Sequence, residues 1–154
     1  MDEFLINNGE LILKKVEETL LFLKEIDYFG IIKRSMKKNE ICLGRIDEGN
    51  LRVVKEIEIS SLKDISYNLV EEDIYHYLRK VRRRNPDSQL YTYISKYIED
   101  AFLGDNSREY LRILLLFPYD TIRNWRKYSI NKKGLSSEDY VNIITKSMKY
   151  EMDV

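Results

Sequence analysis

Apolar residues recur with helical spacing along most of the chain. From about Gly9 to Ile26 they follow the spacing i, i+3, i+7, i+10, between Leu13 and Leu23. This spacing places them on one face of a helix, with charged residues on most of the rest. A shorter segment, Tyr28 to Lys38, predicts a second helix. The first forty residues are therefore expected to be helical.

The pattern changes between residues 41 and 59. Residues 41–43 (ICL) are a short apolar run, and residues 51–59 (LRVVKEIEI) alternate and are rich in β-branched side chains. A polar loop that contains Gly49 separates the two runs. Alternation with β-branched residues is typical of strands. We therefore expect a small β-hairpin or β-pair at about residues 41–59, inserted after the first two helices.

Helical patterns return for the remainder of the chain. Start signals such as a capping residue followed by an acid, or a proline in the first turn, predict helices that open near Asn68, Asn85, Ser107, Pro118 and Ser136. The helix before Pro118 has almost no polar face, so we expect it to be the central, most buried one. The predicted fold is mainly α, a single helical domain over residues 1–154.

Composition and charge exclude several classes of protein. The chain has 154 residues, of which 26 are basic and 26 acidic, so no overall charge draws it to nucleic acid or lipid. It has one cysteine, Cys42, and one histidine, His76, which excludes intrachain disulfides and zinc sites of the usual Cys and His type. Without a secretory leader or a long apolar run, we expect a soluble cytoplasmic protein with no membrane partner and no cofactor. We expect Cys42 to be buried and His76 to lie on the surface.

Two stretches resemble a known family. Residues 41–50 (ICLGRIDEGN) fit the frame His-Gly-Asp, four residues, Asn of kinase-like phosphotransferases of the aminoglycoside/choline kinase type, with Gly44 and Asn50 in place. Residues 77–84 (YLRKVRRR) and 113–128 (ILLLFPYDTIRNWRKY) look like the helical tail of the spore coat kinase-like (CotS-type) family. The resemblance implies the C-terminal lobe of a kinase-like fold without its N-terminal nucleotide lobe.

The departures from that family determine the expected function. Arg45 stands where the family has its catalytic Asp, so the local charge is inverted, and Asn50 stands where the family holds a metal ion. A turn residue after Gly49 is the more ordinary interpretation of Asn50. We therefore expect no enzyme, but a non-catalytic, pseudokinase-like structural or interaction protein of spore coat assembly. Its expected partners are proteins, and a homo-oligomer is left open.

A basic helix end supplies the alternative hypothesis. Arg79, Arg82, Arg83 and Arg84 cluster where the helix macrodipole already favours cations. The same cluster, extended by Arg123, Trp125 and Arg126, is a candidate interaction patch, and nucleic acid ranks below protein as its expected partner. A third hypothesis is one half of a split phosphotransferase whose other lobe lies on a second chain.

Overall fold

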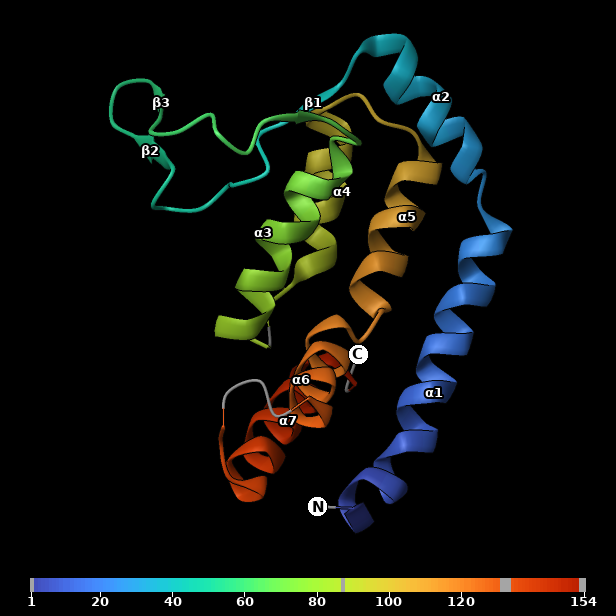
Figure 1. The fold of residues 1–154 in the computed structure, drawn as a ribbon. Coiled ribbons are helices and arrows are strands. Elements are labelled where there is room, and N and C mark those ends of the chain that lie inside the picture. Colours follow the sequence, from blue (N-terminus) through green and yellow to red (C-terminus); the bar gives the residue numbers. More distant parts are fainter. Residues whose placement is uncertain (1, 87, 131–133, 153–154) are drawn as a thin grey trace. The chain divides into compact units, whose positions relative to one another are not determined.

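The structure, a computed structural model, describes residues 2–86, 88–130 and 134–152. It is mainly helical, with two small two-stranded sheets (Figure 1). Its contacts divide the chain into two compact units. Unit 1 combines Met1–Glu25 with Ile113–Val154, and unit 2 is Ile26–Arg112. The mainly helical prediction is confirmed.

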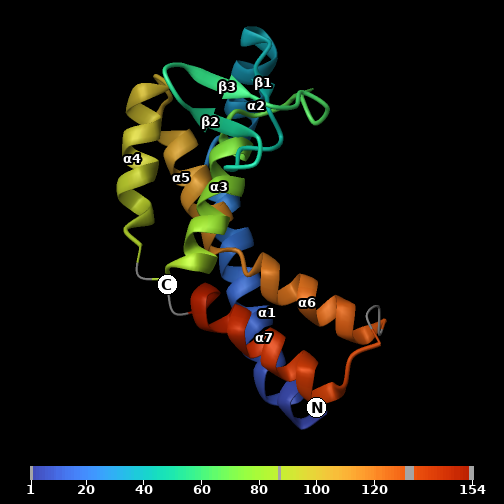
Figure 2. The ribbon, with the colours of Figure 1, turned by 90° about the vertical axis from the view of Figure 1, so that its left-hand side faces the viewer.

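Unit 1 contains α1 (Asp2–Glu25), α6 (Tyr119–Ser129), α7 (Ser137–Glu151) and the end of α5 (Asp105–Leu116). Helices α6 and α7 lie side by side (Figure 2). The predicted start of α7 is confirmed, because Ser136 and Asp139 form a reciprocal capping box. At its other end, the buried Glu151 carboxylate accepts hydrogen bonds from the backbone N–H groups of Asp120 and Thr121, each at 2.8 Å. Glu151 thereby joins the end of α7 to the start of α6.

Unit 2 contains the remaining elements. They are α2 (Tyr28–Lys38), β1 (Ile41–Cys42), β2 (Leu51–Val53), β3 (Ile57–Ile59), β4 (Ser66–Tyr67), α3 (Glu71–Arg84), α4 (Leu90–Asp100) and most of α5. Its interior includes Ile31, Leu78, Ile94 and Leu111. The predicted second helix has the bounds of α2.

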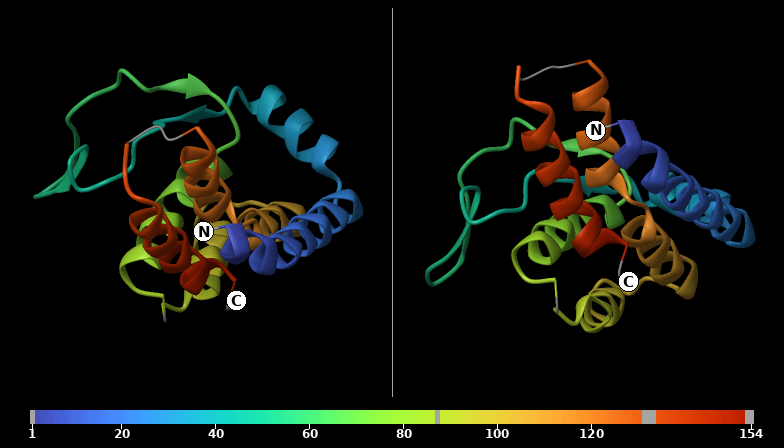
Figure 3. Two further views of the ribbon diagram at one scale, coloured as in Figure 1. Left: turned by 60° about the horizontal axis from the view of Figure 1, so that its bottom comes forward. Right: turned by 90° about the horizontal axis from the view of Figure 1, so that it is seen from below.

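The strands pair in a way that the sequence predicts only in part. A β-pair within residues 41–59 is confirmed, since β2 and β3 form an antiparallel hairpin in which Leu51 faces Ile59 and Val53 faces Ile57. Its turn lies at residues 54–56 and not in the polar loop that contains Gly49. β1 pairs instead with β4, a strand that the sequence analysis missed. The hairpin stands away from α3 and α4 in both views of Figure 3.

Several predicted helix starts need correction. Asn68 does not cap α3, because its side-chain oxygen accepts a hydrogen bond from the N–H of Leu69, and the N-cap is Val70. Asn85 ends α3 instead of starting α4, since its N–H bonds the carbonyl of Val81. In both cases the asparagine makes a local hydrogen bond that differs from the one a helix N-cap makes.

The buried face of α3 also differs from the apolar stripe in its sequence. It carries Glu71, Tyr75, Leu78, Arg79 and Arg82. Three of these five side chains are charged, so hydrophobic periodicity identifies this face only in part. A buried charge is stable only when it is paired, so α3 contributes ion pairs and hydrogen bonds to the interior as well as apolar contacts.

Candidate functional site

The loop between β1 and β2 holds the two residues that the kinase-like frame singles out. Asn50 is 1% exposed, and its amide donates to the carbonyls of Arg45 and Ser61 at 2.8 and 3.1 Å. Its side-chain oxygen accepts from the N–H of Ser61 at 2.8 Å. Asn50 thus fastens both ends of the β2–β3 hairpin to the loop, and its amide is engaged with backbone.

Arg45 lies beside the carboxylate of Asp47. One Asp47 oxygen accepts from Lys80 Nζ at 2.9 Å and from Arg45 Nε at 3.3 Å, while the other accepts from the N–H of Gly49. The hydrogen bond from Lys80, followed by that from Arg45, lowers the pKa of Asp47 to about 2. Asp47 therefore stays ionised and holds two cations together at the surface.

The predicted basic patch is divided by the fold. Arg79 and Arg82 lie in the interior, with exposed fractions of 7% and 1%. Arg83 and Arg84 are exposed and line a surface hollow of about 420 Å³. The other residues around this hollow are Arg45, Asp47, Glu48, Gly49 and Lys80. Four cations and two carboxylates surround the hollow, so its net charge is about two positive.

The second half of the predicted patch lies on α6, in unit 1. Arg123 and Arg126 are exposed and Trp125 is half-buried. Trp125 and Arg126 line a largely apolar groove of about 370 Å³ between α1 and α6, whose other lining residues include Gly9 and Leu13. Arg123 is not among the lining residues. Of the predicted patch, Arg83 and Arg84 therefore line the hollow in unit 2, Trp125 and Arg126 line the groove in unit 1, and the other three residues line neither.

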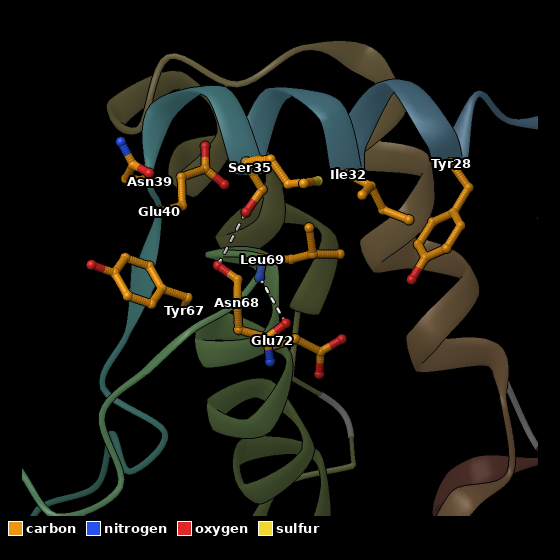
Figure 4. A pocket seen from close by; sticks show the side chains of 10 residues that line it. Tyr28, Ile32, Ser35, Asn39, Glu40, Tyr67, Asn68, Leu69 and Glu72 are labelled. Carbon is orange, nitrogen blue, oxygen red and sulfur yellow. Dashed lines mark hydrogen bonds between the residues drawn. The ribbon is translucent and has the colours of Figure 1, made fainter.

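A third hollow, which the sequence analysis missed, lies in unit 2 between α2 and the start of α3. We call it the Tyr28 pocket. Its volume is about 450 Å³, and Figure 4 shows nine of its lining side chains with labels. The lining residues are Tyr28, Ile32, Ser35, Met36, Asn39, Glu40, Tyr67, Asn68, Leu69 and Glu72. This size is usual for a small-ligand pocket.

A buried charge cluster forms the frame behind the Tyr28 pocket. The Arg34 guanidinium donates to both oxygens of Glu40 and to both oxygens of Glu71, at 2.8–2.9 Å, and to Ser107 Oγ at 2.6 Å. Burial alone would raise the pKa of Glu71, but hydrogen bonds from Arg34 and Ser107 outweigh it and lower the pKa. We call this cluster the Arg34 clasp. It joins α2, α3 and α5.

Cys42 lies close to the clasp as an inert thiol. It is 2% exposed, and its Sγ donates to the carbonyl of Leu69 at 2.8 Å. Burial, followed by the charge of Asp73, raises the pKa of this thiol to about 12. The predictions of a buried Cys42 and an exposed His76 are confirmed.

One face of the β2–β3 hairpin is a further surface that the sequence analysis did not single out. Because facing residues share a side of the sheet, Leu51, Val53, Ile57 and Ile59 all lie on one face. Val53 is 82% exposed, Ile57 71% and Ile59 42%. The opposite face carries the pair Arg52 and Glu58. We call the first face the apolar hairpin face.

Comparisons with protein-family models, with curated proteins and with solved structures gave no match. Within the described residues, no group of three or more His, Cys, Asp or Glu side chains is placed to hold a metal ion. No helix among those residues combines the length and apolar character that a membrane crossing requires. Assignment of function therefore rests on the local chemistry of these surfaces.

Proposed function

We propose that this protein is a non-catalytic structural protein that self-associates through the apolar hairpin face. The observation that carries the proposal is the exposure of Val53 and Ile57, which face each other across the two strands. A two-stranded hairpin alone is at best marginally stable in water. A second layer packed on its apolar face would stabilise it, and each Val or Ile side chain buried contributes about 1.5–3 kcal/mol.

A second copy of the chain can approach this face without charge repulsion. The polar side and the tip of the hairpin carry Arg52, Lys55, Glu56 and Glu58, so their charges cancel. Two hairpins that pack face to face about a two-fold axis therefore do not repel each other, and the facing residues Arg52 and Glu58 stay on the opposite side of the hairpin.

Exposed apolar side chains continue beyond the hairpin face. Val54, Leu62 and Ile65, which flank the hairpin strands in the sequence, are exposed by 72%, 57% and 44%. Together with Val53, Ile57 and Ile59 they are six apolar side chains left in water, a concentration that favours association.

The non-catalytic part of the proposal is supported by the loop before the hairpin. The position of the family's catalytic Asp is occupied by Arg45, which pairs with Asp47, and the Asn50 amide is used on backbone. We accordingly expect no rise in melting temperature with Mg·ATP. A clear rise would favour the split phosphotransferase hypothesis.

Spore coat assembly remains the cellular setting that we propose, on the resemblance of residues 77–84 and 113–128 alone. A fluorescent fusion followed through sporulation of the source organism tests it. Recruitment to the forming coat supports this setting, and a diffuse signal throughout contradicts it.

Sedimentation velocity over a range of protein concentrations tests self-association. The variant Val53→Lys/Ile57→Glu removes the apolar face but places opposite charges across the strands, which preserves the hairpin. We expect the dissociation constant of the dimer to rise at least ~100-fold, since a symmetric dimer loses four buried side chains and ~1.4 kcal/mol corresponds to tenfold. The matched control is Phe29→Gln, an equally exposed apolar side chain on α2.

Three outcomes decide whether the chain self-associates through this face. Weakened association of the hairpin variant with an unchanged control supports the proposal. A wild-type protein that stays monomeric up to its solubility limit contradicts it, as does equal weakening in the Phe29→Gln control.

Binding of polyanions such as nucleic acid is a second candidate, favoured by the hollow beside Arg83 and Arg84. Because Arg79 and Arg82 are buried, fewer cations are available at the surface than the sequence indicates. Oligonucleotide binding that falls steeply with salt and is lost in Arg83→Ala/Arg84→Ala would support it. Binding that is unaffected by this double substitution would contradict it.

A further inference from the structure

The walls of the Tyr28 pocket combine apolar side chains with aromatic rings. Ser35 and Leu69 are buried at the base of the pocket. Met36 and Tyr67 at its mouth are exposed by 73% and 78%. Figure 4 shows the Tyr28 ring and the Tyr67 ring at opposite sides of the pocket, with Leu69 between them. An apolar stem fits this cavity, and the exposed Tyr67 ring is available to a cation.

The carboxylate that lines the pocket and lies outside the Arg34 clasp is that of Glu72. Its side chain is 25% exposed, and one oxygen accepts a hydrogen bond from the Tyr110 hydroxyl at 3.1 Å. Tyr110 in turn contacts the ring of Tyr28, with 5.3 Å between ring centroids. His76 Nε2 lies 3.9 Å from the other Glu72 oxygen. Glu72 is thus held at the pocket wall by α5.

The charges around the pocket are unbalanced. Glu40 and Glu71 share the single guanidinium of Arg34, and Glu72 adds a third carboxylate. One positive charge against three negative ones leaves two negative charges beside the cavity. An anionic ligand is therefore disfavoured, and a neutral apolar ligand would cover Glu72 without compensating its charge. A cation on an apolar stem satisfies both the charge and the walls.

We propose that the Tyr28 pocket binds an arginine side chain of a protein partner, with its guanidinium paired to Glu72. A guanidinium pairs with carboxylates through planar, directed hydrogen bonds and stacks on aromatic rings. Its three-carbon stem packs against Ile32 and Leu69. Lysine, a compact and strongly hydrated point charge, fits the same place less well.

The probe is a capped pentapeptide with one central arginine, titrated into ¹⁵N-labelled protein and followed by NMR. We expect saturable shifts at pocket residues and binding at least tenfold weaker when the arginine is replaced by citrulline, its neutral isostere. A lysine peptide is expected to bind severalfold more weakly than the arginine peptide. Free arginine is expected to bind more weakly still, because it carries its own carboxylate toward an acidic wall.

The variant Glu72→Gln keeps the acceptor for Tyr110 and removes the charge, and we expect it to weaken arginine-peptide binding at least tenfold. Tyr67→Leu is expected to weaken it about two- to fivefold, the equivalent of ~0.5–1 kcal/mol for an exposed cation–π contact. Glu109→Gln, the same charge change at the surface of α5, is the matched control. Thermal unfolding of each variant establishes that it is folded.

Equal binding of the citrulline and arginine peptides overturns the proposal. So does unchanged binding in Glu72→Gln, or tighter binding of free arginine than of the peptide, which would assign the pocket to a small amine instead. The hairpin variant Val53→Lys/Ile57→Glu is expected to bind the peptide normally. Pocket binding and self-association are therefore tested separately.

Discussion

Unit 2 contains two three-charge clusters of opposite composition. In the Arg34 clasp, one cation lies between two carboxylates, Glu40 and Glu71, at 2.8–2.9 Å. On the surface, one carboxylate, Asp47, lies between two cations, Arg45 and Lys80.

The contact distances are similar but the surroundings differ. The Glu71 side chain is 0% exposed, whereas those of Arg45 and Lys80 are 44% and 39% exposed. Water and salt screen an exposed pair, and a buried charge that loses its partner keeps the full cost of its desolvation. Burial, more than distance, therefore decides how much each ion pair contributes to stability.

Removal of the central cation of the clasp should have the largest effect. Arg34→Met leaves Glu71 buried without a cation, and we expect a loss of about 3–5 kcal/mol in the free energy of unfolding. Urea unfolding followed by circular dichroism measures it. Arg112→Met, which breaks an exposed pair with Glu109, is the control and should change stability by less than about 1 kcal/mol. Equal losses in the two variants would show that burial is not the deciding factor.

Acid should reduce the contribution of the Arg34 clasp to stability, because the pKa of Glu71 is lowered in the folded protein. In the folded protein the pKa of Glu71 lies below its ordinary value of 4.5, so folding favours the ionised carboxylate. Its contribution is complete above about pH 4.5 and is lost as the pH falls through the folded pKa.

Without Arg34, burial instead raises the pKa of Glu71. The stability difference between wild type and Arg34→Met should therefore shrink as urea midpoints are measured from pH 7 down to pH 3. A constant difference across that range would contradict this assignment.

Removal of the central charge of the surface cluster should have the smallest effect. Asp47→Asn keeps the side-chain acceptor for the N–H of Gly49 and loses only the charge beside Arg45 and Lys80. We expect no resolvable change in melting temperature at moderate salt. Any change in melting temperature at low salt should disappear as salt is added, because salt screens exposed charges. A large fall in melting temperature that persists in high salt would contradict this, because it would show that Asp47 contributes as much as a buried charge.

Local patterns in the sequence were sufficient for many of the elements. The bounds of α2, the capping box of α7 and the strand structure of residues 51–59 were all predicted, because each depends on residues that are neighbours along the chain. The exposed basic residues Arg83 and Arg84 were also identified, because they follow each other at the end of a predicted helix. The burial of Arg79 and Arg82 was not, because a hydrophobic pattern treats every charged residue as a surface residue.

The features that were not predicted depend on contacts between residues far apart in the sequence. Strand β4 pairs Tyr67 with Ile41, and two residues of strand carry too little alternation to predict. Arg34 and Glu71 are 37 positions apart, and Tyr110 and Glu72 are 38 apart. No local signal joins such residues, so neither the clasp nor the Tyr28 pocket was predicted from the sequence.

Sequence patterns were enough for the helical character of the chain and for the alternating apolar and polar strand residues of 51–59. Packing of distant segments was needed to establish which charged side chains are buried, which apolar ones stay in water, and which carboxylate lies at a pocket. Secondary structure follows from backbone hydrogen bonds and side-chain periodicity over a few residues. Burial and ion pairing depend instead on which distant segments of the chain fold together.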